Sequence, residues 1–233
     1  MRCAIVQPSY IPWRGYFDLI QRVDLFIFYD DVQYDRRGWR NRNRIKTAQG
    51  SRWLTIPVHA RHVQIEKIPI NAITTDGNDW AQRHLELLKL NYRRAPHFPE
   101  HEEWLQRLYS APPPLLADFT IRVTQEIAGK LGVKQTRFAR SSEFGVSGAK
   151  TERLLALLQR SGATTYLSGP SARSYLDEVL LERAGVAVEW MTYNYAEYAQ
   201  LHPPFDPHVT VLDLLFMTGH EAAAYIGPGI KPR

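Results

Sequence analysis

Short apolar runs and amphipathic stretches alternate from the start of the chain, and this alternation predicts an α/β fold. Residues 2–7 form an apolar run that Pro8 stops, and residues 24–30 form a second apolar run. Between them, residues 15–23 carry apolar side chains at helical spacing. A strand, a helix and a strand in this order are typical of a βαβ unit with a parallel sheet.

The rest of the chain continues the same alternation. Residues 79–93 have the clearest helical pattern, because Trp80, His84 and Leu88 fall on one apolar arc at 100° per residue. The pattern also predicts helices over 115–131, 150–160 and 175–183 and strands over 164–168 and 186–193.

Residues 51–70 form two extended pieces that can pair as a β-hairpin. The predicted fold class is α/β and Rossmann-like, with a mostly parallel central sheet, flanking helices and a β-hairpin elaboration. At 233 residues the chain has the length of one domain, residues 1–233. Three successive prolines within residues 110–116 stop a helix and stiffen the chain, so this stretch is a candidate boundary of a sub-lobe.

The composition is that of an ordinary soluble globular protein, with 44% hydrophobic and 23% charged residues. No apolar run is long enough to cross a bilayer, and the start of the chain lacks a signal peptide's cleavage pattern, so a cytoplasmic location is expected. Cys3, the one cysteine, excludes a disulfide framework and a cysteine-based zinc site. No histidines and carboxylates have metal-ligand spacing, so no metal site is predicted. The net charge of +5 fits an anionic partner.

Positive charge is concentrated in residues 36–46. In an extended strand, alternate side chains point to opposite faces, so cations would lie on one face and a tryptophan with two asparagines on the other. Single-stranded nucleic acid is usually bound where aromatic rings and cations share a face. The pattern therefore argues against nucleic acid and favours one phosphorylated ligand. The cationic face is Arg36, Arg40, Arg42, Arg44 and Lys46, and the opposite face is Trp39, Asn41, Asn43 and Ile45.

His84 is the candidate general base. A polar group on the buried face of a helix must find a partner or line a cavity. An imidazole can take a proton from an attacking amine near neutral pH. The alternative is a core histidine with a structural hydrogen bond. Asp31 follows a predicted parallel strand, where α/β sheets place ligands, and can orient His84 or bind a sugar hydroxyl. Alternatively, Asp30, Asp31 and Asp35 neutralise arginines of the basic segment.

Residues 167–171 lead from a predicted strand toward a helix and contain Ser168 and Gly169. Exposed backbone N–H groups in such a turn can hold an anion. The segment is not a P-loop, because no Gly-Lys-Ser/Thr follows, and Ser168 lacks the surroundings of a nucleophilic serine. An anion-binding turn is the functional prediction for this segment.

Long sequence blocks resemble the WbqC-like protein family. The blocks cover nearly the whole chain in order, and blocks of this length are specific. They are "QPSYIPWRGYFDLI" (7–20), "FYDDVQY" (28–34), "GWRNRNRIK" (38–46), "WLTIPV" (53–58), "YLSGPSARSYLD" (166–177) and "YAQLHPPFDPHVTVLDLLFMTG" (198–219).

The resemblance implies a part in the biosynthesis of O-antigen, a component of lipopolysaccharide, and of related surface polysaccharides. Such proteins have been suggested to be transferases. The expected function is therefore transfer of an aminoacyl (glycyl-like) or acyl group to the amine of a nucleotide-linked amino sugar. No bound cofactor is expected. The activated donor is left open among a carrier-protein or coenzyme A thioester, an adenylate and an aminoacyl-tRNA, with an acyl carrier protein as a candidate partner.

The residue pattern and the matched blocks together give a predicted site with His84 and Asp31 as its catalytic residues. The residues that follow the first strand are expected to meet those that follow the second around one cavity, because carboxyl ends of neighbouring parallel strands open into one crevice. The predicted substrate-binding residues are Gln7, Tyr10, Trp13, Tyr16, Gln33, Tyr34, Trp39, Asn41, Arg42, Asn43, Lys46, Ser168 and Gly169.

Two other functions stay open. The sequence "WRGYFDLI" weakly resembles the H-x-G-H-x-x-L-I element of nucleotidylyltransferases and pantothenate synthetases, which suggests a nucleotide-binding, adenylyltransferase-like protein. Trp13 and Tyr16 replace its two histidines, however, and neither can stabilise charge on a transferred phosphoryl group as a cation does. The second alternative is a non-catalytic protein that binds nucleotide sugars or acts as a scaffold.

Overall fold

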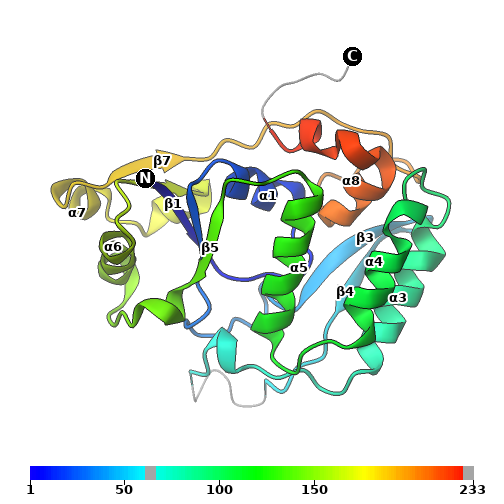
Figure 1. Ribbon diagram of the computed structural model, residues 1–233, viewed down its shortest axis with the longest axis horizontal. Helices are drawn as coiled ribbons and strands as arrows, with labels where there is room; N and C mark the ends of the chain where they lie inside the picture. Colours follow the sequence, from blue (N-terminus) through cyan, green and yellow to red (C-terminus); the bar gives the residue numbers. More distant parts are fainter. Residues whose placement is uncertain (61–66, 228–233) are drawn as a thin grey trace.

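The computed structural model describes residues 1–60 and 67–227. Its centre is a five-stranded sheet in the order β5-β2-β1-β6-β7, in which each neighbouring pair is parallel (Figure 1). The predicted α/β class with a parallel central sheet is confirmed. The strands are β1 (Arg2–Val6), β2 (Leu25–Phe28), β5 (Arg137–Arg140), β6 (Thr165–Ser168) and β7 (Ala187–Trp190).

The central strands are apolar runs because both faces of the sheet are covered. In β2 all four residues are buried. Phe26 and Phe28 belong to the hydrophobic cluster on one face, and Leu25 and Ile27 belong to the cluster on the other. The helices therefore form a layer on each side of the sheet.

Helices α1 (Arg14–Gln21) and α5 (Leu116–Lys130) contribute to the first cluster, and α6 (Lys150–Ser161) and α7 (Glu178–Arg183) contribute to the second. The first cluster extends beyond the sheet to the elements on the right of Figure 1. None of the helices in the described residues is long and apolar enough to cross a membrane. The additional elements are the hairpin β3 (Arg42–Thr47) and β4 (Gly50–Thr55) and helices α3 (Asp79–Tyr92), α4 (Pro99–Ser110) and α8 (Val211–Thr218).

The hairpin prediction is confirmed, but its strands differ from the expected ones. The basic segment itself supplies β3, and β4 pairs with it in antiparallel register, with Arg44 opposite Trp53. Gly50 has a φ of +100° at the turn, a conformation that glycine adopts without strain. Residues 61–66, part of the expected second strand, lie outside the described residues. The turn at Gly50 pairs residues 50–55 with the basic segment instead of with the residues that follow them.

Candidate functional site

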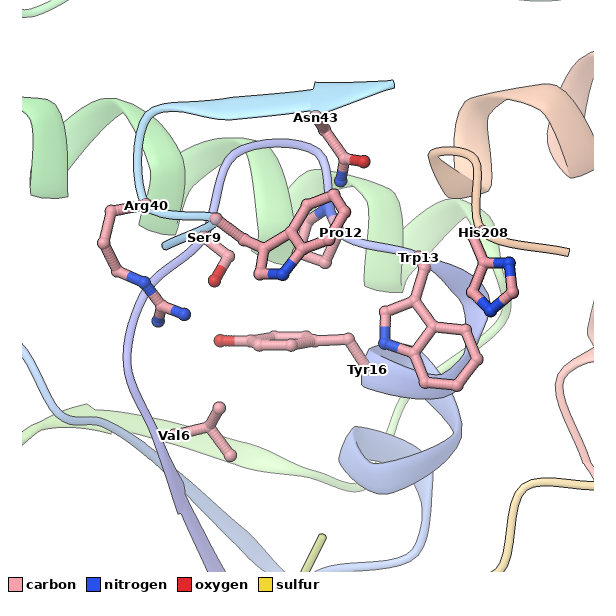
Figure 2. Close-up of a pocket in the computed structure, with 9 residues that line it drawn as sticks. Val6, Ser9, Pro12, Trp13, Tyr16, Arg40, Asn43 and His208 are labelled. Carbon is pink, nitrogen blue, oxygen red and sulfur yellow. The ribbon is translucent and has the colours of Figure 1, made fainter. Parts of the chain in front are cut away.

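A cavity of about 290 Å³ opens at the carboxyl end of β1. From β1 the chain adds β2 and β5 on one side and later β6 and β7 on the other, so the strand order reverses between β1 and β6. Open α/β sheets bind ligands outside the strand ends at such a point. The wall consists of apolar and aromatic Val6, Pro12, Trp13, Tyr16 and Trp39 and polar Ser9, Arg40, Asn43 and His208 (Figure 2).

Asn43 holds the loop between β1 and α1 in an uncommon conformation. Ile11 has a φ of +36°, which β-branched residues rarely adopt. The Asn43 amide Nδ2 donates to the carbonyl oxygens of Tyr10 at 3.1 Å and Ile11 at 2.7 Å, and its Oδ1 accepts from the Arg44 N–H at 2.7 Å. Backbone strain of this kind persists where the surroundings fix it, often at functional sites. The hairpin thus sets the shape of the cavity wall.

Trp13 packs against the first turn of α1. A Cβ atom placed on Gly15 would lie under 3.0 Å from three atoms of the Trp13 indole. The close approach of the ring therefore depends on the missing side chain at position 15. This explains why a glycine stands inside a helix, where it is otherwise unfavourable.

Gly15→Ala is expected to displace the Trp13 ring and to lower the free energy of unfolding by about 1–3 kcal/mol, the usual cost of overpacking. The measurement is urea unfolding followed by circular dichroism. The matched control is Gly129→Ala in α5, where a Cβ atom would meet nothing within 4 Å and alanine favours the helix. Equal stability of Gly15→Ala and wild type would contradict the close packing.

Arg40 is a largely buried cation on the cavity wall. Its Nη1 donates to the carbonyl oxygens of Gln7 at 3.1 Å and Pro8 at 3.4 Å, while its Nε is buried without a hydrogen-bond partner. Burial lowers the pKa of its guanidinium, and Tyr16 and Asp35 oppose this effect. Within residues 1–60 and 67–227, no carboxylate lies within 4.0 Å of this cation. Such a group is suited to receiving an anion from a ligand.

The predicted alternation holds only over the start of β3, where Asn43 is buried and Arg42 and Arg44 are half-buried, because Lys46 is also buried and residues 36–41 precede the strand. The expectation that cations and aromatic rings face apart is wrong. Trp53 lies on the cationic face, with its ring centroid 4.7 Å from Arg42 Cζ and 5.7 Å from Arg44 Cζ. The Trp39 and Trp53 ring centroids are 5.2 Å apart. The reason is that β4 supplies an aromatic ring directly opposite Arg44.

Two of the three acids expected to neutralise the basic segment pair with arginines elsewhere, whereas Asp35 acts on Arg40. Asp31 lies 2.6 Å from Arg153, and Asp30 lies 4.0 Å from Arg140. No cation of residues 36–46 is within 4.0 Å of a carboxylate in the part of the chain that the structure describes. In the same part, no three potential ligands gather as a metal ion requires. Within that part, the cations of the basic segment therefore form no close ion pair, and Asp35 and Asp206 act on Arg40 and Arg44 at longer range.

His84 is buried and is not part of the cavity wall. Its Nδ1 lies 2.9 Å from the Tyr10 hydroxyl, which lies 2.6 Å from the Tyr109 hydroxyl. Burial lowers the pKa of the imidazole to about 4, opposed in part by a backbone hydrogen bond with Thr55. Asp31, the other predicted catalytic residue, accepts a hydrogen bond from Ser141 and pairs with Arg153. The two catalytic roles stay predictions.

Four of the predicted binding residues, Trp13, Tyr16, Trp39 and Asn43, line the cavity. Three more lie beside it. The Gln7 carbonyl oxygen accepts from the Tyr16 hydroxyl at 3.1 Å. Ser168 and Gly169 are at the end of β6, next to β1, and Gly169 lies close to the hydroxyl of Tyr193, whose ring packs edge-on against Trp13 at 5.0 Å. This turn is therefore near the cavity.

The remaining predicted binding residues do not line the cavity. Of the residues that were expected to meet there, Trp13 and Asn43 do so, whereas Tyr10 and Gln33 do not. Tyr10 and Tyr34 are buried in the core, and Gln33 is exposed. Asn41 donates to the Ile56 carbonyl, Lys46 donates to the Pro204 carbonyl, and Arg42 donates to the carbonyls of Arg37 and Gly38. Their binding roles stay predictions.

His208 lines the cavity and was missed from the sequence. It lies between β7 and α8, where its N–H donates to Asp206 Oδ1 at 2.8 Å and its ring Nδ1 lies 3.6 Å from the same atom. The Thr210 N–H donates to the Arg44 carbonyl at 2.9 Å and fixes this loop on β3. Figure 2 shows His208 and Arg40 at opposite ends of the cavity. The sequence signal was the block 198–219, which contains His208.

Residues 7–225 match the WbqC-like protein family. The chain belongs to this family. It is similar to "Uncharacterized protein Rv1507c" of Mycobacterium tuberculosis (strain ATCC 25618 / H37Rv), with 47% identity over 227 residues that cover 97% of each chain. No solved structure gives a significant match. In this WbqC-like protein, every residue of the cavity wall except Val6 falls within the matched range.

Proposed function

We propose that this WbqC-like protein transfers an aminoacyl or acyl group to the amine of a nucleotide-linked amino sugar in surface polysaccharide biosynthesis. The observation that supports it is Arg40, a largely buried guanidinium without a carboxylate within 4.0 Å among the described residues, on the wall of a cavity at the reversal of strand order. A buried cation is costly unless an anion or hydrogen bonds compensate it. A guanidinium forks onto phosphate oxygens, so a diphosphate fits this end of the cavity.

The aromatic wall suits the rings of such a ligand. Trp13, Tyr16 and Trp39 surround the cavity. Indole and phenol rings provide large apolar faces for a sugar or a base, and a few polar groups then fix its orientation. Ser9 is one such group, since its hydroxyl lies on the wall. The cavity therefore combines an anion end with a ring-binding middle.

His208 at the other end is the proposed general base. The amine nitrogen of the sugar attacks the carbonyl carbon of the donor, a C–N bond forms, and the bond from that carbon to the leaving sulfur or oxygen breaks. The amine proton passes to His208 and then to the leaving group. Asp206 Oδ1 lies 3.6 Å from the imidazole Nδ1 and can orient the ring. His84 with Asp31 is the alternative base and partner.

Arg40→Gln is expected to weaken the binding of UDP- or dTDP-linked amino sugars by about 1.5–3 kcal/mol, because a charge-assisted contact to phosphate is lost. Isothermal titration calorimetry measures the effect after a thermal-shift panel has selected the best nucleotide sugar. The control is Arg36→Gln, an exposed cation of the same segment that is not on the wall. Equal losses of affinity in both variants would show that the ligand is attracted by the overall positive charge of the segment and would contradict a specific contact with Arg40.

Product analysis separates the proposed function from its alternatives. The protein is incubated with the selected amino sugar and, in turn, an aminoacyl adenylate, a coenzyme A thioester, a carrier-protein thioester and an aminoacyl-tRNA. Mass spectrometry should detect the amide of one acyl group with the sugar. Binding without any product would favour a non-catalytic protein, and ATP-dependent release of diphosphate would favour an adenylyltransferase.

A further inference from the structure

Two exposed tryptophans and two half-buried arginines come together on the β3–β4 hairpin and the segment before it. Trp39 and Trp53 each keep 43% of their surface exposed, although both are large apolar side chains. Arg44 Cζ lies 5.9 Å from the Trp39 ring centroid and 5.7 Å from that of Trp53, and Arg42 Cζ lies 4.7 Å from that of Trp53. We call these four residues the tryptophan–arginine surface.

The arginines of this surface form no close ion pair with the described residues, although Asp206 is near enough for Arg44 to help lower the pKa of its carboxyl. Neither Arg42 nor Arg44 lies within 4.0 Å of a carboxylate in the described ranges 1–60 and 67–227. The Arg44 Nε is also buried without a hydrogen-bond partner. Arginines next to exposed indole rings are typical of surfaces that bind single-stranded nucleic acid, where bases stack on the rings and the cations follow the phosphates. An acidic protein would use the arginines but would leave the rings without stacking partners.

The tryptophan–arginine surface connects two hollows. Trp39 lines the cavity at the end of β1. Trp53 lines a second hollow of about 530 Å³, together with Arg52 and with Leu90 and Asn91 of α3. The two indole centroids are 5.2 Å apart. A single-stranded nucleic acid that lies in the second hollow and stacks its bases on both rings would therefore end at the cavity.

We propose that the tryptophan–arginine surface binds the unpaired end of an RNA, and that this RNA is the aminoacylated donor of the transfer. The donor assignment rests on the proposed function, whereas the binding of RNA does not. The terminal aminoacyl ester would then enter the cavity beside Trp39. In the transfer, the sugar amine forms the C–N amide bond and the ester C–O bond breaks. The ribose oxygen leaves as a hydroxyl with the proton that the amine gives up.

The test is fluorescence anisotropy with a labelled single-stranded RNA of about ten nucleotides, a length within the range that one binding domain covers. Trp53→Ala should weaken binding roughly tenfold to a hundredfold through the loss of stacking. Arg44→Gln should weaken binding. It should also reduce the magnitude of the slope of log affinity against log salt concentration by about 1, the value expected for the loss of one phosphate contact. Trp53 is exposed and Arg44 is half-buried, and melting temperatures verify that both variants are folded.

Matched controls test whether the effect is local. Tyr175→Ala removes another exposed aromatic side chain, 66% exposed, and Arg107→Gln removes an exposed cation from α4. Both variants should bind the RNA as wild type does. Losses as large as those of Trp53→Ala and Arg44→Gln would show general attraction to a basic protein and would overturn the proposal.

The donor step has its own readout. Aminoacyl-tRNA should yield the amide of the amino sugar, and Trp53→Ala should lower this yield without changing the affinity for the nucleotide sugar. If wild type binds the nucleotide sugar but not the RNA, or if a carrier-protein thioester is the productive donor, this inference fails and the proposed function stands. If the RNA binds but no nucleotide sugar does, the proposed function fails and the RNA-binding surface stands.

Discussion

Replacing His84 with alanine is expected to lower the free energy of unfolding by about 3 kcal/mol and to leave turnover per folded molecule unchanged. The imidazole is 5% exposed, so its removal leaves a cavity among aromatic rings. It also removes the 2.9 Å hydrogen bond to the Tyr10 hydroxyl, which is buried. Urea unfolding and initial rates, both on the same preparation, measure the two effects.

The pH dependence of stability provides a second measurement for His84. Its pKa is lowered from 6.5 to about 4 in the folded protein, so between these values the unfolded chain binds a proton that the folded chain does not. The neutral imidazole therefore contributes its full share to the free energy of unfolding above about pH 6.5. This contribution decreases as the pH falls from about 6.5 to about 4, and the total decrease is at most about 3 kcal/mol. His84→Gln should therefore lose less stability than wild type between pH 7.5 and pH 4.5.

A stable His84→Ala protein that binds the nucleotide sugar but has lost turnover would restore the general-base prediction. Identical pH slopes in wild type and His84→Gln would show that burial does not lower the pKa of the imidazole and would contradict the buried structural role. The structural role predicts the reverse of both results. The two measurements therefore separate a core histidine from a catalytic one.

The sequence was sufficient for those elements whose burial leaves a regular pattern. The βαβ unit at residues 1–30 and helix α3 were predicted because their apolar positions follow the period of the element. Strand β5 was missed, since its four residues, RFAR, carry two arginines and are only partly buried. Helix α8 was missed because six of its eight residues are buried, so no polar face marks a helical period. Helix α4 was also missed.

The candidate site was only partly predictable, because it depends on contacts between distant segments. Trp13, which follows the first strand, and Asn43, which follows the second, were expected to meet because the carboxyl ends of neighbouring parallel strands open into one crevice, and both line the cavity. The position of Trp53 depends on the pairing of β4 with β3, and that of His208 depends on a hydrogen bond between residues 210 and 44. Neither contact leaves a periodic signal in the sequence. Because the pairing of β4 with β3 could not be read from the sequence, the cationic face was expected to lack aromatic rings.

Replacing His208 with alanine is expected to lower the rate of amide formation roughly 10²–10⁴-fold, the usual contribution of a general base. The affinity for the nucleotide sugar should change little, because the proposed phosphate contact is with Arg40, at the opposite end of the cavity (Figure 2). The exposed position of His208 means that its removal should cost little stability.

His59→Ala is the matched control for His208→Ala, since His59 is also exposed and its ring lies 3.5 Å from a carboxylate, that of Asp76, but it is not on the cavity wall. Added imidazole should restore part of the rate of His208→Ala, because the vacated position is open to solvent and a free base can enter it. Neither effect is expected for a histidine that merely lines the wall. Full activity of His208→Ala, with loss of activity in a folded His84→Ala protein, would transfer the role of the base to His84.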